Sequence, residues 1–322
     1  MNININLGVD KLLKTISNGI GKLYEPCHIQ RIAESRAKEI NILSEAISSC
    51  DMPVVYHSNG LHIDNRYSNE VAERVLKRVL NDEIRKQHII DSIVLDAYKK
   101  LEHVTEVDSK PVDPNWTKHF FDSVGSVSDE ELKKIWVEVL AGEIQHPESY
   151  SLRALNILRS MTKFDINAFK KLSSLAFIVQ GVPLFFYNRT LLNKYEITMA
   201  EISALQECGI LSYSMSEYRN LPDTNIGMCI HNYEIIGVIK QKKNEAMDFN
   251  FPILQITFSG YQLLNAVSCQ YNTDYMIDSL KLLKTFNPGY TVTAHKITGF
   301  SVKGIRYNGK NDLLIMNEHN EV

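Results

Sequence analysis

The sequence has few cysteines and no pattern that would join them. The five cysteines lie at positions 27, 50, 208, 229 and 269, and no two form a Cys-x-x-Cys pair. An odd number of scattered cysteines is typical of reduced thiols in the cytoplasm rather than of a disulfide-stabilised secreted domain. The sequence therefore predicts a cytoplasmic protein of bacterial type.

Long hydrophobic runs are also missing. The densest apolar stretch, residues 175–187, is broken by Gln180, Gly181 and Pro183. A membrane-spanning helix needs about 18 apolar residues in succession, so none is predicted. At the N-terminus, Asn alternates with Ile or Leu, which is not the pattern of a signal peptide.

Motifs that carry catalysis or hold metals are absent as well. The chain contains no Gly-x-Ser-x-Gly elbow and no phosphate-binding loop of the Gly-x-x-x-x-Gly-Lys-Ser/Thr type. The close pairs Cys27-His28, His57 with His62, and Cys229 with His231 lack the double-pair spacing of a structural zinc site. We therefore expect no enzymatic activity, no catalytic residues, no cofactor and no metal.

The composition is that of an ordinary globular protein. The 322 residues are 44% hydrophobic and 23% charged, with a net charge of −3. This balance excludes a protein that coats nucleic acid with a wholly basic surface, but it leaves room for a local basic patch. The length suits two domains or one domain with a helical extension.

Helical periodicity dominates the N-terminal third. Apolar residues at helical spacing predict helices over residues 9–24, 29–48 and 68–101, the last of which is long and balanced in charge. Such helices pack in cis or join copies of the chain. The candidate oligomerisation residues are Ile32, Ile40, Leu43, Val75, Val79, Ile90 and Val94. Alternatively, the lysine-bearing helix 9–24 lies on a membrane surface through Leu12, Leu13 and Ile16.

Two capping boxes mark helices in the rest of the chain. Ser128 with Glu131, and Thr198 with Glu201, have the spacing at which each side chain pairs with the other residue's backbone N–H. Two interpretations remain for Glu130, Glu131 and Glu143. They either form an exposed interaction surface or belong to the helix caps and the core around them. A fourth helix is predicted from about residue 165 to 179.

Residues 198–267 follow the order helix, Gly-Ile-Leu, two β segments and helix, which is expected near the end of a winged-helix unit. The two β segments, 233–240 and 251–258, are predicted to form a hairpin. The predicted fold class is therefore mainly α, with an N-terminal helical hairpin, a central helical domain and a winged-helix-like α+β C-terminal module. The predicted domains are residues 1–104, 112–182, 190–270 and 271–322.

Basic and aromatic residues alternate near the C-terminus. From Ser279 to Asn311 there are six basic residues and no acidic ones, and three lysines occupy the predicted wing. Basic groups attract phosphates and aromatic rings stack on unpaired bases, whereas lysines also protect exposed sheet edges. The candidate nucleic-acid-binding residues are Lys240, Lys242, Lys243, Lys281, Lys284, Lys296, Lys303, Arg306, Lys310, Tyr290, Phe300 and Tyr307.

One stretch of the chain resembles a known family. It runs from Val112-Asp113-Pro114-Asn115-Trp116, through Ser128–Leu132 with Ile135-Trp136, to Leu140-Ala141-Gly142-Glu143. This stretch resembles a bacterial family of unknown function whose members are similar to alpha-type abortive-infection (phage-defence) proteins. Residues 19–26, 29–33 and 147–151 also resemble that family. The resemblance supplies no catalytic residues.

The resemblance implies a role in defence, and the helices imply assembly. We expect a non-enzymatic anti-phage protein that forms a homo-oligomer through its N-terminal helices. Its C-terminal half would recognise a phage protein or nucleic acid. The alternatives are a winged-helix nucleic-acid-binding regulator and an effector that contacts the membrane through helix 9–24.

Overall fold

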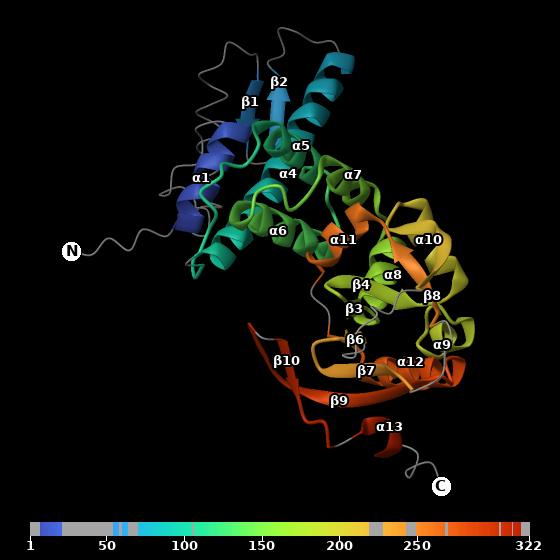
Figure 1. Cartoon of the computed structure of the whole chain (residues 1–322). Helices are drawn as coiled ribbons and strands as arrows, with labels where there is room; N and C mark the ends of the chain where they lie inside the picture. The colour runs from blue at the N-terminus through green and yellow to red at the C-terminus, as the bar shows by residue number, and fades with distance from the viewer. Residues whose placement is uncertain are drawn as a thin grey trace, which may run out of the picture. The chain divides into compact units, whose positions relative to one another are not determined.

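The chain divides into two compact units, Met1–Arg159 and Ser160–Val322. Figure 1 shows their helices and strands in a computed structural model. The structure describes residues 7–20, 54–57, 60–63, 70–104, 106–218, 228–242, 249–267, 270–302, 304–310 and 312–316.

In its described part, the first unit consists of helices and one short hairpin. Its elements are α1 (Leu7–Ile20), β1 (Val54–His57), β2 (Gly60–Ile63), α4 (Glu70–Leu101), α5 (Pro114–Val124), α6 (Glu130–Gln145) and α7 (Leu152–Ser160). The long helix predicted over 68–101 is confirmed as α4. The helix predicted over 29–48 lies outside the described residues.

Aromatic rings form the core of the first unit. Trp116 stacks on Phe120 with ring centroids 5.2 Å apart, and Phe120 meets Trp136 edge-on at 5.4 Å. All three rings are buried, and α1 packs against α4, α5 and α6. The apolar residues whose spacing predicted separate helices therefore pack together in one core that these helices share.

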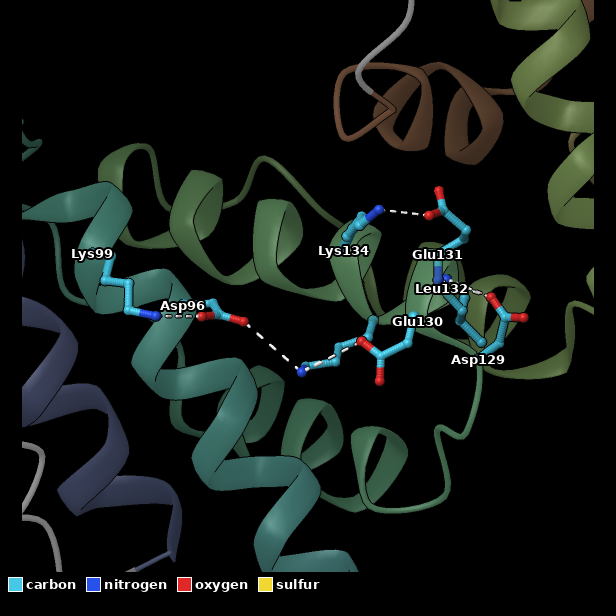
Figure 2. A network of polar contacts seen from close by, with 8 residues as sticks. Asp96, Lys99, Asp129, Glu130, Glu131, Leu132 and Lys134 are labelled. Atoms are coloured by element: carbon cyan, nitrogen blue, oxygen red, sulfur yellow. Dashed lines mark hydrogen bonds and ion pairs between the residues drawn. The ribbon is translucent and has the colours of Figure 1, made fainter. Parts of the chain in front are cut away.

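The start of α6 differs from the sequence prediction. The N-cap is Asp129 rather than Ser128, and its Oδ1 accepts hydrogen bonds from the backbone N–H of Glu131 and of Leu132, at 2.9 and 3.1 Å (Figure 2). Because Asp and Ser cap equally well, the choice depends on where the preceding loop enters the helix, which the sequence does not show. Glu131 pairs with Lys134.

A surface charge network joins α4 to α6. Asp96 on α4 lies 3.0 Å from the Lys99 Nζ, and its other oxygen lies 3.9 Å from the Lys133 Nζ (Figure 2). Lys133 also approaches Glu130 at 3.7 Å. Exposed ion pairs of this kind contribute about 0–1 kcal/mol each, so the network gives the helices little stability.

Glu143 is buried, whereas Glu130 is exposed and Glu131 is half-buried. Its carboxylate accepts backbone hydrogen bonds from Glu148 (2.7 Å) and Tyr150 (3.0 Å), which fixes the loop after α6. Glu143 is 1% exposed, and this burial raises the pKa of its carboxyl above the ordinary value of 4.5. Glu143 therefore belongs to the scaffold and not to an interaction surface.

The raised pKa of Glu143 predicts a pH-dependent stability. The folded unit binds the Glu143 proton more tightly than the unfolded chain does. This contribution to stability is present below pH 4.5 and is lost as the pH rises through the raised pKa. Relative to wild type, Glu143→Gln should therefore become more stable as the pH rises from about 4 to about 7. Urea unfolding followed by tryptophan emission measures this, because both tryptophans lie in the first unit. Glu130→Gln is the exposed control, and an equal pH trend in both variants would contradict the prediction.

The second unit is built on one eight-stranded sheet. Its strands are β3 (Phe177–Val179), β4 (Val182–Phe186), β5 (Leu211–Tyr218), β6 (Met228–His231), β7 (Ile235–Gln241), β8 (Phe251–Ile256), β9 (Tyr290–Ser301) and β10 (Gly304–Tyr307). Their order across the sheet is β10-β9-β7-β6-β3-β4-β8-β5, and every pairing is antiparallel.

Helices pack around this sheet. They are α8 (Lys163–Ser174), α9 (Arg189–Lys194), α10 (Met199–Glu207), α11 (Phe258–Leu264), α12 (Thr273–Phe286) and α13 (Leu313–Met316). The helix α12 covers one face of β7 and β9 closely: a Cβ added at Gly237 would lie 2.3 Å from Leu280. The capping box at Thr198 and Glu201 is confirmed at the start of α10.

The predicted fold class is wrong. The sheet shows that the chain is not mainly α with a small winged-helix module. The two segments predicted to form a wing hairpin, now β7 and β8, do not pair: β7 lies between β6 and β9, and β8 lies between β4 and β5. The prediction missed β6, the near neighbour with which β7 pairs, and the other partners, β9, β4 and β5, are too distant along the chain to leave a local signal.

A second error concerns the helix predicted to end at residue 179. The helix α8 ends at Ser174, and the apolar segment that follows forms the β3–β4 hairpin. Its two-residue turn has positive φ at Gln180 (51°) and Gly181 (81°), as a type I′ turn requires. A short apolar run is compatible with either a buried helix or a buried strand. In this segment the turn at residues 180 and 181 favours the hairpin.

Candidate nucleic-acid interface

The β9–β10 hairpin carries the basic residues predicted to contact nucleic acid. Residues 290–310 contain Lys296, Lys303, Arg306 and Lys310 and no Asp or Glu. Lys296, Arg306 and Lys310 are exposed, and Lys303 lies outside the described residues. The hairpin therefore presents positive charge with no acidic residue in its own sequence.

A glycine positions one of these cations. Arg306 pairs with Gly299 across the hairpin, and a Cβ at Gly299 would lie 3.1 Å from the Arg306 Nη2. The missing side chain gives the guanidinium room to lie over the backbone of β9. Because successive residues of a strand point to opposite faces, the guanidinium lies on the face opposite the ring of Phe300, the next residue of that strand.

Four aromatic rings gather next to this hairpin, and we call them the aromatic cluster: His231, Tyr233, Tyr271 and Phe300. The Tyr233 ring lies 5.7 Å from that of Phe300, 5.4 Å from that of Tyr271 and 5.3 Å from that of His231. Tyr233 and Phe300 remain 49% and 48% exposed. Tyr233 is thus the centre of a cluster drawn from three separate segments.

Strand register extends the aromatic surface across the sheet. His231 on β6 pairs with Ile236 on β7, which in turn pairs with His295 on β9. Ile236 precedes Gly237, so this row lies on the face opposite α12. The His295 ring stacks on Tyr307 of β10 at 5.1 Å. His231, His295 and Tyr307 therefore share one face of the sheet.

The turn between β6 and β7 holds Tyr233 at the centre of the cluster. The Asn232 side-chain oxygen accepts hydrogen bonds from the backbone N–H of Glu234 (3.2 Å) and of Ile235 (2.8 Å). Tyr233 has a φ of 68°, a left-handed conformation that strains a bulky residue by on the order of 1–3 kcal/mol. The backbone of Ile297 also donates to the Glu234 oxygen at 2.8 Å, which ties the turn to β9.

His231 contributes an aromatic ring rather than a charge. It is half-buried, and this burial lowers its pKa below the ordinary value of 6.5. Burial disfavours the charged imidazolium, so the ring is neutral near pH 7.

Several predicted residues lie away from this surface. Tyr290 is buried, with its ring 5.1 Å from that of Phe249, so it is not available for stacking. Lys240 pairs with Thr291, five residues along β9 from Lys296, which is about 17 Å. Lys242 directly follows the last residue of β7, and its Nζ donates a hydrogen bond to the Pro288 oxygen. Lys281 and Lys284 lie on α12, and Lys243 lies outside the described residues.

Three residues of the cluster were missing from the sequence prediction: His231, Tyr233 and Tyr271. They lie about 20 to 60 positions before β9; the sheet register brings His231 and Tyr233 to that strand, and Tyr271 joins them through its ring contact with Tyr233. A weak local signal exists, because an Asn just after a strand marks a turn whose next residue is displayed at its tip.

The candidate residues of the first unit fall into two groups. Val75 and Val79 on α4 are exposed, whereas Ile90 and Val94 are buried within the unit. The other predicted oligomerisation residues, Ile32, Ile40 and Leu43, lie outside the described residues.

The helix α1 offers little to a membrane. Leu12 and Ile16 are fully buried, and Leu13 is half-buried. The contact with lipid that was predicted through these three side chains therefore lacks the exposure it needs. In the described parts of the chain, no helix combines the length and apolarity needed to cross a bilayer.

Together these features define an α+β protein with a helical first unit and an antiparallel second unit that displays aromatic and basic side chains. The family described as "Protein of unknown function (DUF2806)" matches residues 73–280, more than half of the chain, and the protein belongs to that family. Membership in a family of unknown function confirms part of the resemblance, while the link to abortive-infection proteins stays a prediction. No curated protein and no solved structure matches the chain.

Proposed function

We propose that the protein is a non-enzymatic recognition protein of bacterial phage defence, acting in the cytoplasm, whose second unit binds nucleic acid. The observation that carries the binding is the β9–β10 hairpin with the residues directly after it, which exposes Lys296, Arg306 and Lys310 and contains no acidic residue between positions 290 and 310. The defence setting is supported by the resemblance of residues 112–143 to relatives of abortive-infection proteins.

The charge distribution supports this site over the rest of the molecule. The whole chain has a net charge of −3, yet residues 290–310 carry four cations and no acid. A local concentration of positive charge on a slightly acidic protein favours phosphate at that place, because counterions released from the nucleic acid drive the binding. Edge protection accounts for cations on β10, the edge strand, but not for Lys296 on β9, which lies between β10 and β7.

Binding at this hairpin predicts a defined salt dependence. The double variant Lys296→Ala, Arg306→Ala should weaken binding to oligonucleotides of any sequence. It should also make the slope of log affinity against log salt concentration shallower by roughly 1.5. Each lost phosphate contact reduces the magnitude of that slope by about 0.7–0.9, and the variant loses two such contacts. Fluorescence anisotropy with labelled oligonucleotides over a salt series measures both.

Lys240→Ala is the matched control, because Lys240 is an exposed lysine of the same sheet at the opposite end of β7. It should change affinity less than either hairpin substitution. No salt-dependent binding by the wild-type protein would refute the proposal. The defence setting is tested separately, by plaque counts on cells that carry the wild-type or the double-variant protein.

A second candidate role is self-assembly through α4. Val75 lies 18 residues before Ile93, which is five helical turns, so the two side chains share one face of the helix. Ile93 is fully buried in the unit, whereas Val75 and Val79 are each 45% exposed. The apolar stripe therefore continues past its own core, and a second copy of α4 would cover it.

The variant Val75→Glu, Val79→Glu should convert an oligomer to a monomer, because it places four carboxylates in the centre of a two-fold interface. Size-exclusion chromatography with light scattering measures this. Val182→Glu is the control, since Val182 is a similarly exposed valine of the second unit. A wild-type protein that is monomeric at micromolar concentration would rule out this role.

A further inference from the structure

We infer that the nucleic acid proposed above lies along the α12 side of the second unit, where cations of α12 and of the β9–β10 hairpin form one row. This inference rests on the proposed nucleic-acid binding and extends it from the hairpin to a whole surface. The ligand that it specifies is a polynucleotide backbone of about six nucleotides or more, bound through its phosphates.

Strand register places Lys296 on the α12 side of the sheet. Gly237 of β7 faces α12, because a Cβ there would lie 2.3 Å from Leu280. Gly237 pairs with Ala294 of β9, so Ala294 faces α12 as well. Lys296 is two residues farther along β9, and side chains two residues apart in a strand point to the same face. The exposed side chain of Lys296 therefore lies on this side.

Arg306 lies on the same side of the sheet. Ile297, the residue after Lys296, points to the opposite face, and it pairs with Tyr307 of β10. Arg306 precedes Tyr307, so its guanidinium points to the α12 side, where Gly299 leaves room for it. The two exposed cations therefore share one face of the hairpin.

The helix α12 continues this face toward the start of β9 (Figure 1). The N–H of Tyr290, the first residue of β9, donates to the oxygen of Asn287, directly after α12, at 3.0 Å. Leu280, in the middle of α12, lies over the middle of the β7–β9 pair. The helix therefore runs alongside β9 in the opposite direction, from near Lys296 to near Tyr290, and these two residues lie about 20 Å apart along the strand.

Two lysines of α12 extend the row of cations. Lys284 is exposed and Lys281 is half-buried, and neither belongs to the face that α12 buries. Because they are three residues apart, they are neighbours on the helix surface. We call Lys284, Lys281, Lys296 and Arg306 the basic row. It spans roughly 20 Å, which is about six steps of a duplex strand at about 3.4 Å each.

The acidic residues of this part of the chain leave the row positive. Residues 273–312 contain six basic residues and three acidic ones. The Asp278 carboxylate accepts hydrogen bonds from the Lys194 Nζ and the Tyr195 hydroxyl, each at 2.7 Å. Asp312 accepts two backbone N–H groups at 3.0 Å, and of the three acids only Asp274 is exposed. An extended row of cations complements a polyanion, and it is longer than a single phosphate can contact.

Neutralising the lysines of α12 tests the basic row. The double variant Lys281→Ala, Lys284→Ala should weaken binding of a labelled hairpin duplex of roughly 12 base pairs about tenfold near 0.1 M salt. The slope of log affinity against log salt concentration should also become shallower by roughly 1.5. Fluorescence anisotropy over a salt series gives the two quantities. Lys240→Ala is the control, because register places Lys240, three residues after Gly237, on the opposite face.

The length of the ligand gives a second test. A duplex of about four base pairs is too short to reach both ends of the basic row. The wild-type protein should therefore bind it with a slope shallower by roughly 1.5 than that for the long duplex. In the Lys281→Ala, Lys284→Ala variant the two lengths should give the same slope, because only the hairpin cations remain.

Asp274 offers a gain of binding, which misfolding cannot produce. Its carboxylate lies in the first turn of α12, at the end of the helix nearest to Lys296. Asp274→Asn removes a charge that repels phosphate and should tighten binding roughly twofold. Glu207→Gln is the matched control, since Glu207 is an exposed acid of α10, which packs against β5 at the other edge of the sheet. It should leave the affinity unchanged.

The outcomes separate this inference from the function on which it rests. If the Lys281→Ala, Lys284→Ala variant keeps the wild-type slope while the Lys296→Ala, Arg306→Ala variant does not, the basic row is wrong and binding at the hairpin stands. Equal slopes of the wild-type protein for the short and the long duplex would also overturn the row. Absence of any salt-dependent binding would overturn the row together with the proposed function.

Discussion

Replacing Gly260 with alanine is expected to lower the free energy of unfolding of the second unit by about 3 kcal/mol. A Cβ at this position of α11 would lie 2.3 Å from the backbone oxygen of Ile210, far closer than any stable contact. That oxygen cannot move away freely, because it accepts a hydrogen bond from the Thr257 backbone, and the Thr257 hydroxyl donates to the Gly209 oxygen. The clash must therefore displace the whole helix.

Calorimetry of the full chain measures this effect. For a unit of this size, a loss of about 3 kcal/mol lowers the midpoint by roughly 6–12 °C. Gly309→Ala is the matched control, since the nearest atom to a Cβ there lies 3.9 Å away. Tryptophan emission should show an unchanged transition for the first unit, where both tryptophans lie. An unchanged midpoint for Gly260→Ala would show that α11 does not pack as closely on this turn as the structure has it.

Local signals in the sequence predicted local structure well. The apolar spacing of residues 68–101 gave α4, and the Thr198-Glu201 pair gave the start of α10. Both depend on contacts within one or two turns of a helix, where residue order determines which side chains meet. Most of the sheet could not be derived in this way, because β9 is far along the chain from its partner β7, and β4 and β5 are far from their partner β8.

The candidate site shows the same division. Lys296, Phe300 and Arg306 were found because they lie in one short stretch of the chain without acidic residues. Tyr290 belongs to the same stretch but turns inward against Phe249, and no pattern in the sequence distinguishes its face from that of an exposed ring. The central ring, Tyr233, lies in a turn that Asn232 marks weakly in the sequence, but only the register of β6, β7 and β9 shows that this turn lies next to β9.

The position of the basic residues also bears on the winged-helix alternative. That alternative placed its DNA contacts on Lys240, Lys242 and Lys243, which were taken as a wing. In the structure, Lys240 pairs with Thr291, and Lys242 donates to the Pro288 oxygen at 2.6 Å. Nucleic-acid binding thus remains a proposal without the winged helix, on a different surface of the second unit.

The largest loss of stability in the first unit is expected at Trp136. The side chain is fully buried and meets Phe120 edge-on, so Trp136→Ala should lower the free energy of unfolding by about 4 kcal/mol. Its indole Nε1 is buried and, among the described residues, has no hydrogen-bond partner. Trp136→Phe therefore breaks no hydrogen bond and removes an unsatisfied donor, which offsets part of the lost packing.

Trp116 offers the contrasting case in the same core. It is also buried, but its Nε1 donates to the Tyr150 oxygen at 2.7 Å. Trp116→Phe should lose that hydrogen bond in addition to the packing, and it should cost about 1–2 kcal/mol more than Trp136→Phe. Urea unfolding followed by emission of the remaining tryptophan measures both variants in the same unit. If the two phenylalanine variants were equally stable, the hydrogen bond from Trp116 to the loop after α6 would contribute nothing to stability.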